Sequence, residues 1–218
     1  MSRKVLITMY MTLDGFAALA AGPDDPEAER EFWEAMWTGP MDDVDTLLLG
    51  RKTYEAWAGF WPGYIDSENE HWRAFARFST RAEKVVFSHT LQTTTLSNSR
   101  IVRGSVADEI SRLRSLPGKN MIVAGGVQLV QSVLAQDLAD ELCLTVSPSI
   151  IGRGLPLFHV EPTPDHDDVV PLGAPGRHDF RLLESRAFRS GAVFLHYAVS
   201  EREKSRYSSP SDSPHPGR

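Results

Sequence analysis

Cysteine is almost absent from this chain, because Cys143 is the only one among 218 residues. An internal disulfide is therefore impossible, and a cysteine-based metal cluster within one chain is excluded. The longest apolar runs, such as 46–49 and 121–124, are far shorter than the roughly 20 residues that cross a bilayer. The basic N-terminus reaches Asp14 after a short apolar stretch, which is typical of a first strand rather than a signal peptide. We therefore expect a cytoplasmic protein with no membrane partner.

Positively charged residues are also fewer than negatively charged ones. Lys and Arg total 23 and Asp and Glu total 29, so the formal net charge is −6. This balance disfavours a nucleic-acid partner, which a basic face would normally attract. Residues 1–200 have the length and composition of one globular domain. Residues 201–218 are rich in serine, proline and charge, and we predict a disordered tail there.

Two common enzyme motifs are missing from the sequence. It has neither the Gly-x-Ser-x-Gly nucleophile elbow of hydrolases nor the three-glycine fingerprint of a standard dinucleotide fold.

Segment 164–168 is rich in Asp and His. Consecutive residues of a proline-bounded loop rarely converge on one ion, so we predict a solvated loop and no metal site.

Short apolar segments alternate with helical segments along residues 1–200. This order predicts an α/β fold, with a mostly parallel central sheet covered by helices on both faces and a C-terminal antiparallel hairpin. Ligands of such sheets bind at the carboxyl ends of the strands. The expected strands are 4–11, 45–49, 84–87, 100–102, 120–124, 141–148, 180–186 and 192–199, and the expected helices are 26–37, 53–60, 69–79, 105–113 and 127–136.

The first junction of interest follows the strand at 45–49. A glycine lets a ligand approach the backbone, two cations add charge, and a helix N-terminus offers free N–H groups. This is a candidate phosphate site. The alternative is a plain turn in which the threonine caps the helix and the cations are solvated. The residues are Gly50, Arg51, Lys52 and Thr53.

Two more junctions have a similar character. Two glycines lie between the strand at 120–124 and the next helix, where a pyrophosphate can lie against backbone amides or the strand and helix can simply pack closely. The strand at 84–87 ends in a hydroxyl, an imidazole and a second hydroxyl, which can hold a ribose phosphate or merely cap a loop. These junctions contain Gly125, Gly126, Val127 and Gln128, and Ser88, His89 and Thr90.

Asp14 and Gly15 follow the first strand. Asp14 is a candidate proton donor that can hydrogen-bond a substrate, or it can anchor the Asp-Gly turn. Trp33 and Trp57 are candidates to stack on a flat heterocyclic substrate, with core packing as the alternative.

Taken in order, these motifs resemble the dihydrofolate-reductase-like superfamily, and more closely its RibD C-terminal type, the reductase domain of bacterial riboflavin biosynthesis. The resemblance covers about residues 3–199. No zinc deaminase signature accompanies the motifs, so the chain resembles a stand-alone member. The segments that carry the resemblance are TLDGF at 12–16, LGRKTYE at 49–55, GGV at 125–127, LADEL at 138–142 and PSIIGRGLPLF at 148–158.

The resemblance implies an NADPH-dependent reductase, similar to the 5-amino-6-(5-phosphoribosylamino)uracil reductase of riboflavin biosynthesis. It would transfer a hydride to a C=N or C=O carbon of a small heterocyclic substrate. Loops 50–53 and 125–128 match the cofactor phosphate and pyrophosphate sites, and loop 88–90 lies near the adenosine 2′-phosphate. Asp14 and Gly15 match the wall beside the nicotinamide. The two cations of loop 50–53 favour NADPH over NADH.

Three further expectations complete the interpretation. The acids of segment 26–37 do not match a pterin-binding motif, so folate reduction is not expected. A non-catalytic nucleotide- or ligand-binding module that keeps the fold is the alternative function. The apolar edge strands expected at the C-terminal hairpin favour a homodimer.

Overall fold

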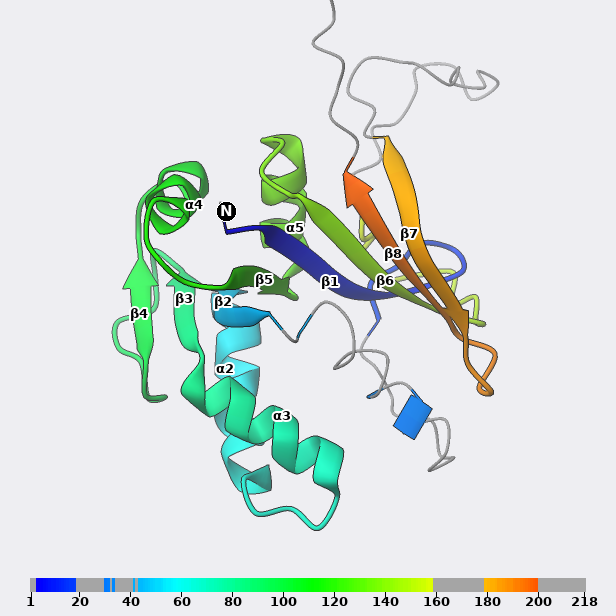
Figure 1. Cartoon of the computed structure of the whole chain (residues 1–218), viewed down its shortest axis with the longest axis horizontal. Coiled ribbons are helices and arrows are strands. Elements are labelled where there is room, and N and C mark those ends of the chain that lie inside the picture. The colour runs from blue at the N-terminus through cyan, green and yellow to red at the C-terminus, as the bar shows by residue number, and fades with distance from the viewer. Residues whose placement is uncertain are drawn as a thin grey trace, which may run out of the picture.

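The computed structural model describes residues 3–18, 30, 31, 33, 41, 43–158 and 179–199. Its strands form one eight-stranded sheet in the order β4-β3-β2-β5-β1-β6-β8-β7 (Figure 1). The first six of these strands run parallel to their neighbours, and β8 and β7 are antiparallel. The strands are β1 Val5–Thr12, β2 Val44–Gly50, β3 Glu83–Phe87, β4 Ser99–Val102, β5 Asn120–Ala124, β6 Glu141–Ser147, β7 Phe180–Ala187 and β8 Val193–Val199.

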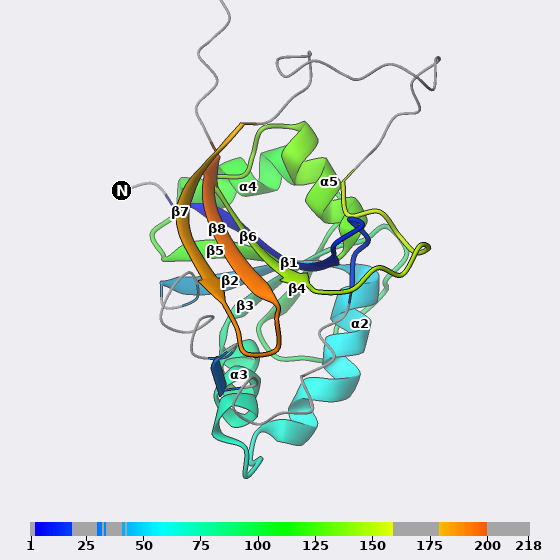
Figure 2. The same ribbon diagram turned by 90° about the vertical axis from the view of Figure 1, so that its right-hand side faces the viewer.

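Helices cover both faces of the sheet, as the sequence predicts. Helices α4 and α5 lie on one face and α2 and α3 on the other (Figure 2). The α/β fold with a C-terminal antiparallel hairpin is therefore confirmed. The helices are α2 Arg51–Phe60, α3 Glu70–Arg81, α4 Val106–Arg114 and α5 Val127–Ala135, and the 3-10 helix η1 Trp61–Tyr64 joins α2 to α3.

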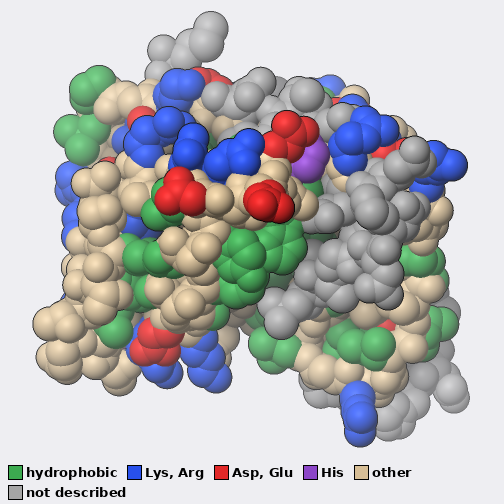
Figure 3. All heavy atoms as spheres, turned by 90° about the horizontal axis from the view of Figure 1, so that it is seen from below, with side chains coloured by type: hydrophobic (Ala, Val, Ile, Leu, Met, Phe, Trp, Pro, Cys, Tyr) green, Lys and Arg blue, Asp and Glu red, His purple; other side chains and the backbone are tan. Residues whose placement is uncertain are grey.

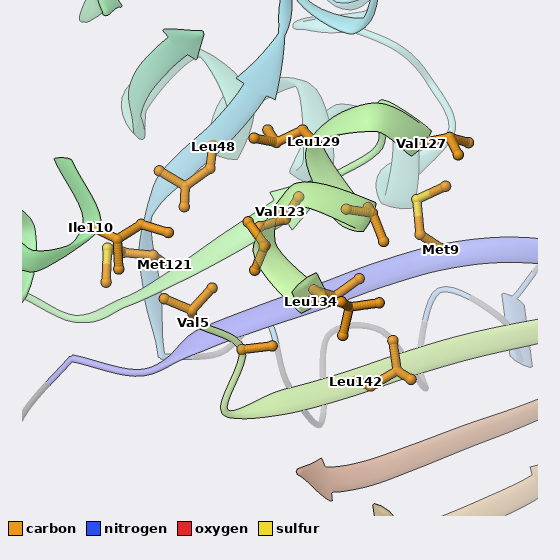
Figure 4. Packing of buried hydrophobic residues seen from close by; sticks show 14 of the residues in the cluster. Val5, Met9, Leu48, Ile110, Met121, Val123, Val127, Leu129, Leu134 and Leu142 are labelled. Atoms are coloured by element: carbon orange, nitrogen blue, oxygen red, sulfur yellow. The ribbon is translucent and has the colours of Figure 1, made fainter. Parts of the chain in front are cut away.

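Each face has its own apolar core, because a buried parallel strand directs alternate side chains to opposite sides. On β1, Val5, Ile7 and Met9 pack toward α4 and α5, whereas Leu6 packs toward α2 and α3. Figure 4 shows the first of these cores, in which Val5 and Met9 lie among side chains from β2, β5, β6, α4 and α5. This alternation decides which β1 side chains reach the face that holds the candidate site.

Local capping explains where the helices begin. The Asn69 side chain accepts hydrogen bonds from the backbone N–H groups of His71 and Trp72, and this cap confirms the predicted start of α3. The predicted start of the helix at Thr53 is wrong. Gly50 is the extended N-cap residue, with φ −77° and ψ 159°, so α2 begins at Arg51 and Thr53 lies in its first turn.

A buried lysine completes the end of α3. The Lys84 ammonium donates to the carbonyls of Ser79 and Ala82, both at 2.6 Å. Lysine is favourable at a helix C-terminus because it pairs with carbonyls that have no partner within the helix. Burial lowers the pKa of Lys84 to about 8. The role of this charge is structural, since it joins β3 to α3.

The C-terminal hairpin carries β7 at the edge of the sheet, where Leu182 and Leu183 are 50% and 42% exposed. The homodimer stays a prediction.

The expected tail at 201–218 and most of the expected helix 26–37 lie outside the described residues, although residues 30, 31 and 33 are helical. Within the described residues, no helix has the length and apolar character needed to cross a membrane.

Candidate functional site

Three predicted loops lie at one rim of the sheet. Strands β3, β2 and β5 are parallel neighbours, with Gly50 paired to Phe87 and Leu48 to Val123. Their carboxyl ends therefore meet at the same edge. Loops 50–53, 88–90 and 125–128, which follow these strands, are brought together there.

The β2 and β5 loops are in close contact, and glycine makes this contact possible. Gly125 and Gly126 have φ values of 90° and 85°, which favour glycine strongly. A Cβ atom at Gly126 would lie 3.4 Å from the Thr53 hydroxyl oxygen and 3.7 Å from the Gly50 backbone nitrogen. The diglycine loop thus packs directly over the first turn of α2.

Two helix N-termini face this rim. The N-cap residues of α2 and α5 are Gly50 and Gly126, and neither helix start has a side-chain cap among the described residues. The Leu129 N–H already donates to the Gly126 carbonyl, but the N–H groups of the first two residues of each helix remain available to an external acceptor. The helix dipoles favour a negative one. This arrangement fits the phosphates of a nucleotide cofactor.

The two cations of loop 50–53 differ in their surroundings. Arg51 donates to both carboxylate oxygens of Glu55, at 3.1 and 2.9 Å, in a solvent-exposed pair along α2. Lys52 instead lines the large cavity described below and has no carboxylate partner among the described residues. Lys52 is therefore the better placed of the two to meet an anion.

Loop 88–90 is shaped by its own hydroxyl and by an arginine that sequence reasoning missed. The Ser88 side chain accepts from the backbone N–H groups of Thr90 and Leu91, so Ser88 caps a turn, whereas His89 and Thr90 are exposed. Arg103 donates to the carbonyls of His89 and Leu91 at 2.7 and 2.9 Å. It immediately follows β4, so a cation just beyond a neighbouring strand was the signal available in the sequence.

A cavity of about 1070 Å³ opens beside the diglycine loop. It lies between α2, η1 and α3 on one side and the carboxyl ends of β1 and β6 on the other. The residues predicted for the site that line it are Lys52, Thr53, Gly125, Gly126, Val127, Trp33 and Trp57. Those that lie outside its lining are Asp14, Gly15, Gly50, Arg51, Ser88, His89, Thr90 and Gln128.

The cavity wall formed by α2, η1 and α3 is aromatic. Trp57 packs against Trp61 and Phe75 with ring centroids 6.3 and 5.3 Å apart, and Trp33 lies 5.5 Å from Phe75. Hydrophobic side chains gather on the face of the molecule from which α2 and α3 project (Figure 3). Trp33 and Trp57 therefore combine the two predicted alternatives, because they pack in an aromatic cluster and also face the cavity.

The floor of the cavity is polar. Thr8, Tyr10 and Thr12 of β1 alternate on the face opposite the α5 core, and the register pairs Tyr10 with Thr145 and Thr12 with Ser147 of β6. Burial raises the pKa of Tyr10, so this phenol stays protonated at neutral pH. Sequence reasoning missed this row, although hydroxyl residues at every second position of two apolar strands were visible.

Asp14 lies beside the cavity and is engaged in loop contacts. Its carboxylate accepts from the Thr12 hydroxyl at 2.5 Å and from the backbone N–H groups of Gly152 and Ile151 at 2.7 and 3.2 Å. The Thr12 hydrogen bond contributes most to lowering the pKa of Asp14, with further help from the two N–H groups. These contacts support the turn-anchoring interpretation, because they join the loop after β1 to loop 148–158.

Comparison with known proteins agrees with this geometry. The model of the RibD C-terminal domain family matches residues 3–194. YyaP of Bacillus subtilis (strain 168) is 27% identical over 200 residues, which cover 89% of this chain and 94% of YyaP.

Two solved structures share the fold. A diaminohydroxyphosphoribosylaminopyrimidine deaminase/5-amino-6-(5-phosphoribosylamino)uracil reductase from Thermotoga maritima has a TM-score of 0.56 and 18% identity, covering 91% of this chain and 57% of that one. Dihydrofolate reductase from Schistosoma mansoni has a TM-score of 0.53 and 16% identity, covering 92% of this chain and all of that one. The chain therefore belongs to the RibD C-terminal domain family and has the dihydrofolate-reductase-like fold.

Proposed function

We propose that this protein is an NADPH-dependent reductase that transfers a hydride to a C=N or C=O carbon of a small heterocyclic substrate. The observation that carries the proposal is the shared rim of β3, β2 and β5, where two helix N-termini and the diglycine loop adjoin the large cavity. Membership of the family supports the same function.

The chemistry divides between the cofactor and the protein. NADPH supplies the hydride from C4 of its nicotinamide, and the heteroatom of the substrate takes up a proton as NADP⁺ forms. The chain would bind the phosphates at loops 50–53 and 125–128 and the substrate ring in the cavity. Orientation within a largely apolar enclosure is the contribution expected from the protein.

The two neighbouring cations of loop 50–53 offer a matched test of cofactor binding. Lys52→Gln is expected to weaken NADPH binding about tenfold, because one charge-assisted contact to phosphate contributes about 1.5 kcal/mol. Arg51→Gln should change the dissociation constant less than about threefold, since Arg51 is already paired with Glu55. Fluorescence titration with NADPH measures both values. Equal effects of the two substitutions, or no binding of NADPH to the wild type, would contradict the proposal.

A non-catalytic ligand-binding module is the second candidate, and one observation favours it. No carboxylate belongs to the part of the cavity lining that the structure describes, and Asp14 is committed to loop contacts. Oxidation of NADPH in the presence of pteridines, pyrimidines and carbonyl compounds distinguishes the two functions. Cofactor binding without oxidation across such a panel would support the binding module.

Asp14→Asn tests whether this carboxyl donates the proton. If the proton comes from solvent, the substitution should leave the shape of the pH profile of kcat unchanged. The asparagine cannot reproduce every hydrogen bond of the carboxylate, so loop 148–158 should become more mobile, which hydrogen exchange at Ile151 and Gly152 can measure. Loss of an ionisation from the pH profile would instead identify Asp14 as the proton donor.

A further inference from the structure

We propose that Tyr10 is the catalytic acid of this protein and donates the proton that the substrate heteroatom gains during reduction. This inference rests on the proposed reductase function, and it assigns to one side chain a proton transfer for which Asp14 and water are the alternatives. Three features support it, namely the position of Tyr10 in the cavity, its place relative to the diglycine loop and the chemistry of a buried phenol.

Tyr10 lies on the face of β1 that borders the cavity. Side chains alternate between the two faces of a strand, and Met9 and Met11 both pack against the core on the side of α4 and α5. Tyr10 therefore lies on the opposite face, and it lines the cavity together with Thr145, its partner in the register of β1 with β6. A substrate bound in the cavity would contact this side chain.

The sheet register places Tyr10 level with the diglycine loop. Strand β1 lies between β5 and β6 (Figure 1), and Thr8 of β1 pairs with Ala124 of β5. Two residues beyond this pair, one chain reaches Tyr10 and the other reaches Gly126, the N-cap of α5. Tyr10 is thus at the carboxyl edge of the sheet, beside the proposed cofactor site. A proton donor is needed there, because the hydride and the proton are added to adjacent atoms of one double bond.

A buried phenol suits this step. The ordinary pKa of tyrosine, about 10, is far below that of an alcohol, so a phenol protonates the anion that hydride addition leaves on the heteroatom. Burial raises the pKa of Tyr10, so the proton is held until it is transferred. Lys52 lines the same cavity, and its positive charge favours the phenolate that remains after the transfer.

The step balances in atoms and electrons. A hydride from C4 of NADPH forms the new C–H bond, and the electron pair of the C=N or C=O π-bond moves to the heteroatom. The O–H bond of Tyr10 breaks, and its proton forms the new N–H or O–H bond. The products are the reduced substrate, NADP⁺ and the Tyr10 phenolate, which regains a proton from water.

Tyr10→Phe removes the proton and keeps the ring. The substrate is whichever pteridine, pyrimidine or carbonyl compound the wild type reduces, and single turnovers are followed by the loss of NADPH absorbance. Hydride transfer should slow about hundredfold or more, because general acid catalysis contributes that much. Tyr197→Phe is the matched control, since it removes a phenol hydroxyl from β8 on the other face of the sheet and should react like the wild type. An unchanged rate in Tyr10→Phe overturns the inference.

The pH profile distinguishes a proton donor from a residue that only supports the cavity. With Tyr10 as the acid, the single-turnover rate of the wild type should be constant up to about pH 9 and fall only in stronger alkali, where the phenol ionises. Asp14 beside the cavity is the described carboxyl group to compare, and its pKa is lowered. Cys143, on the same face of β6, stays a thiol because burial raises its pKa. A rate that falls between pH 4 and about pH 7 would identify a carboxyl or imidazole donor and overturn the inference.

A second measurement needs no turnover. Difluorotyrosine incorporated at position 10 of the full chain ionises at a lower pH than tyrosine, and fluorine NMR follows its ionisation. NADP⁺ carries a positive nicotinamide ring and NADPH does not, so NADP⁺ should lower the pH of ionisation by about one pH unit or more relative to NADPH. The same label at position 197 should ionise at one pH with either nucleotide. Equal ionisation of the label at position 10 with both nucleotides overturns the inference.

Nucleotide titration separates this inference from the proposed function. A chain that binds NADPH and reduces a member of the panel, but whose Tyr10→Phe variant reacts equally fast, retains the reductase function and rejects Tyr10 as its acid. A chain that binds neither nucleotide, or that binds them and reduces no member of the panel, rejects the reductase function and the proton transfer together.

Discussion

Gly126→Ala is expected to weaken NADPH binding at least tenfold and to lower the free energy of unfolding by about 1–2 kcal/mol. The φ of Gly126 is +85°, a conformation that L-residues with side chains adopt at a cost. The new methyl group would also lie 3.4 Å from the Thr53 hydroxyl oxygen. Separating the diglycine loop from α2 would move both helix N-termini away from the shared phosphate position. NADPH titration and urea unfolding measure the two effects.

Gly59→Ala provides the matched control, because Gly59 lies within α2 and a Cβ atom there would have nothing within 4 Å. Alanine in a helix is more favourable than glycine, so unfolding should become harder by about 0.5–1 kcal/mol. NADPH binding should not change. If Gly126→Ala binds NADPH as tightly as Gly59→Ala does, the diglycine loop is not part of the cofactor site.

The positions of the three loops could be predicted because their signals are local. A short apolar run that ends in Gly50 or in the Gly125-Gly126 pair identifies a strand and the turn after it. Parallel strands alternating with helices then place those turns at one edge. The strand order β3-β2-β5, which makes the loops neighbours, agrees with that expectation.

The part of the cavity formed by β1 and β6 was harder to predict, because it depends on the pairing of two strands that are far apart in the sequence. Thr8 and Thr145 are separated by most of the chain and share a face only because β1 and β6 pair in a particular register. The role of Asp14 was hard to predict for the same reason, since its hydrogen-bond partners Ile151 and Gly152 lie on a loop that is far away in the sequence. The sequence around Asp14 allowed both a catalytic and an anchoring role, and only the tertiary contacts favour the second.

The cavity exists because the helices on its side of the sheet cover the strands unequally. Helices α2 and α3 pack over β3, β2 and β5, where inward-facing side chains such as Leu47, Leu49 and Ile122 are apolar. Toward the carboxyl ends of β1 and β6 the positions on this face carry hydroxyls, which do not support an apolar helix interface. The change from apolar to hydroxyl side chains across the sheet therefore marks the boundary between core and site.

Glu141→Gln is expected to lower the free energy of unfolding by about 2 kcal/mol at pH 7. The Glu141 carboxylate lies 2.8 Å from Nε2 of His196 and 2.6 Å from the Lys4 ammonium, and its side chain is 12% exposed. The His196 hydrogen bond and the Lys4 contacts together lower the pKa of Glu141 to about 2. These contacts join the residue just before β1 to β6 and β8, at the end of the sheet opposite the cavity.

The pH dependence of this effect identifies its cause. The pKa of Glu141 is lower in the folded chain than in the unfolded one, so its stabilisation is complete above about pH 4.5 and is lost as the pH falls toward 2. Urea unfolding from pH 7 to pH 3 should therefore show wild type and Glu141→Gln converging in acid. Glu184→Gln removes an exposed pair with Arg186 and should change stability by less than about 0.5 kcal/mol. A Glu141→Gln difference that stays constant down to pH 3 would attribute the loss to packing rather than to charge.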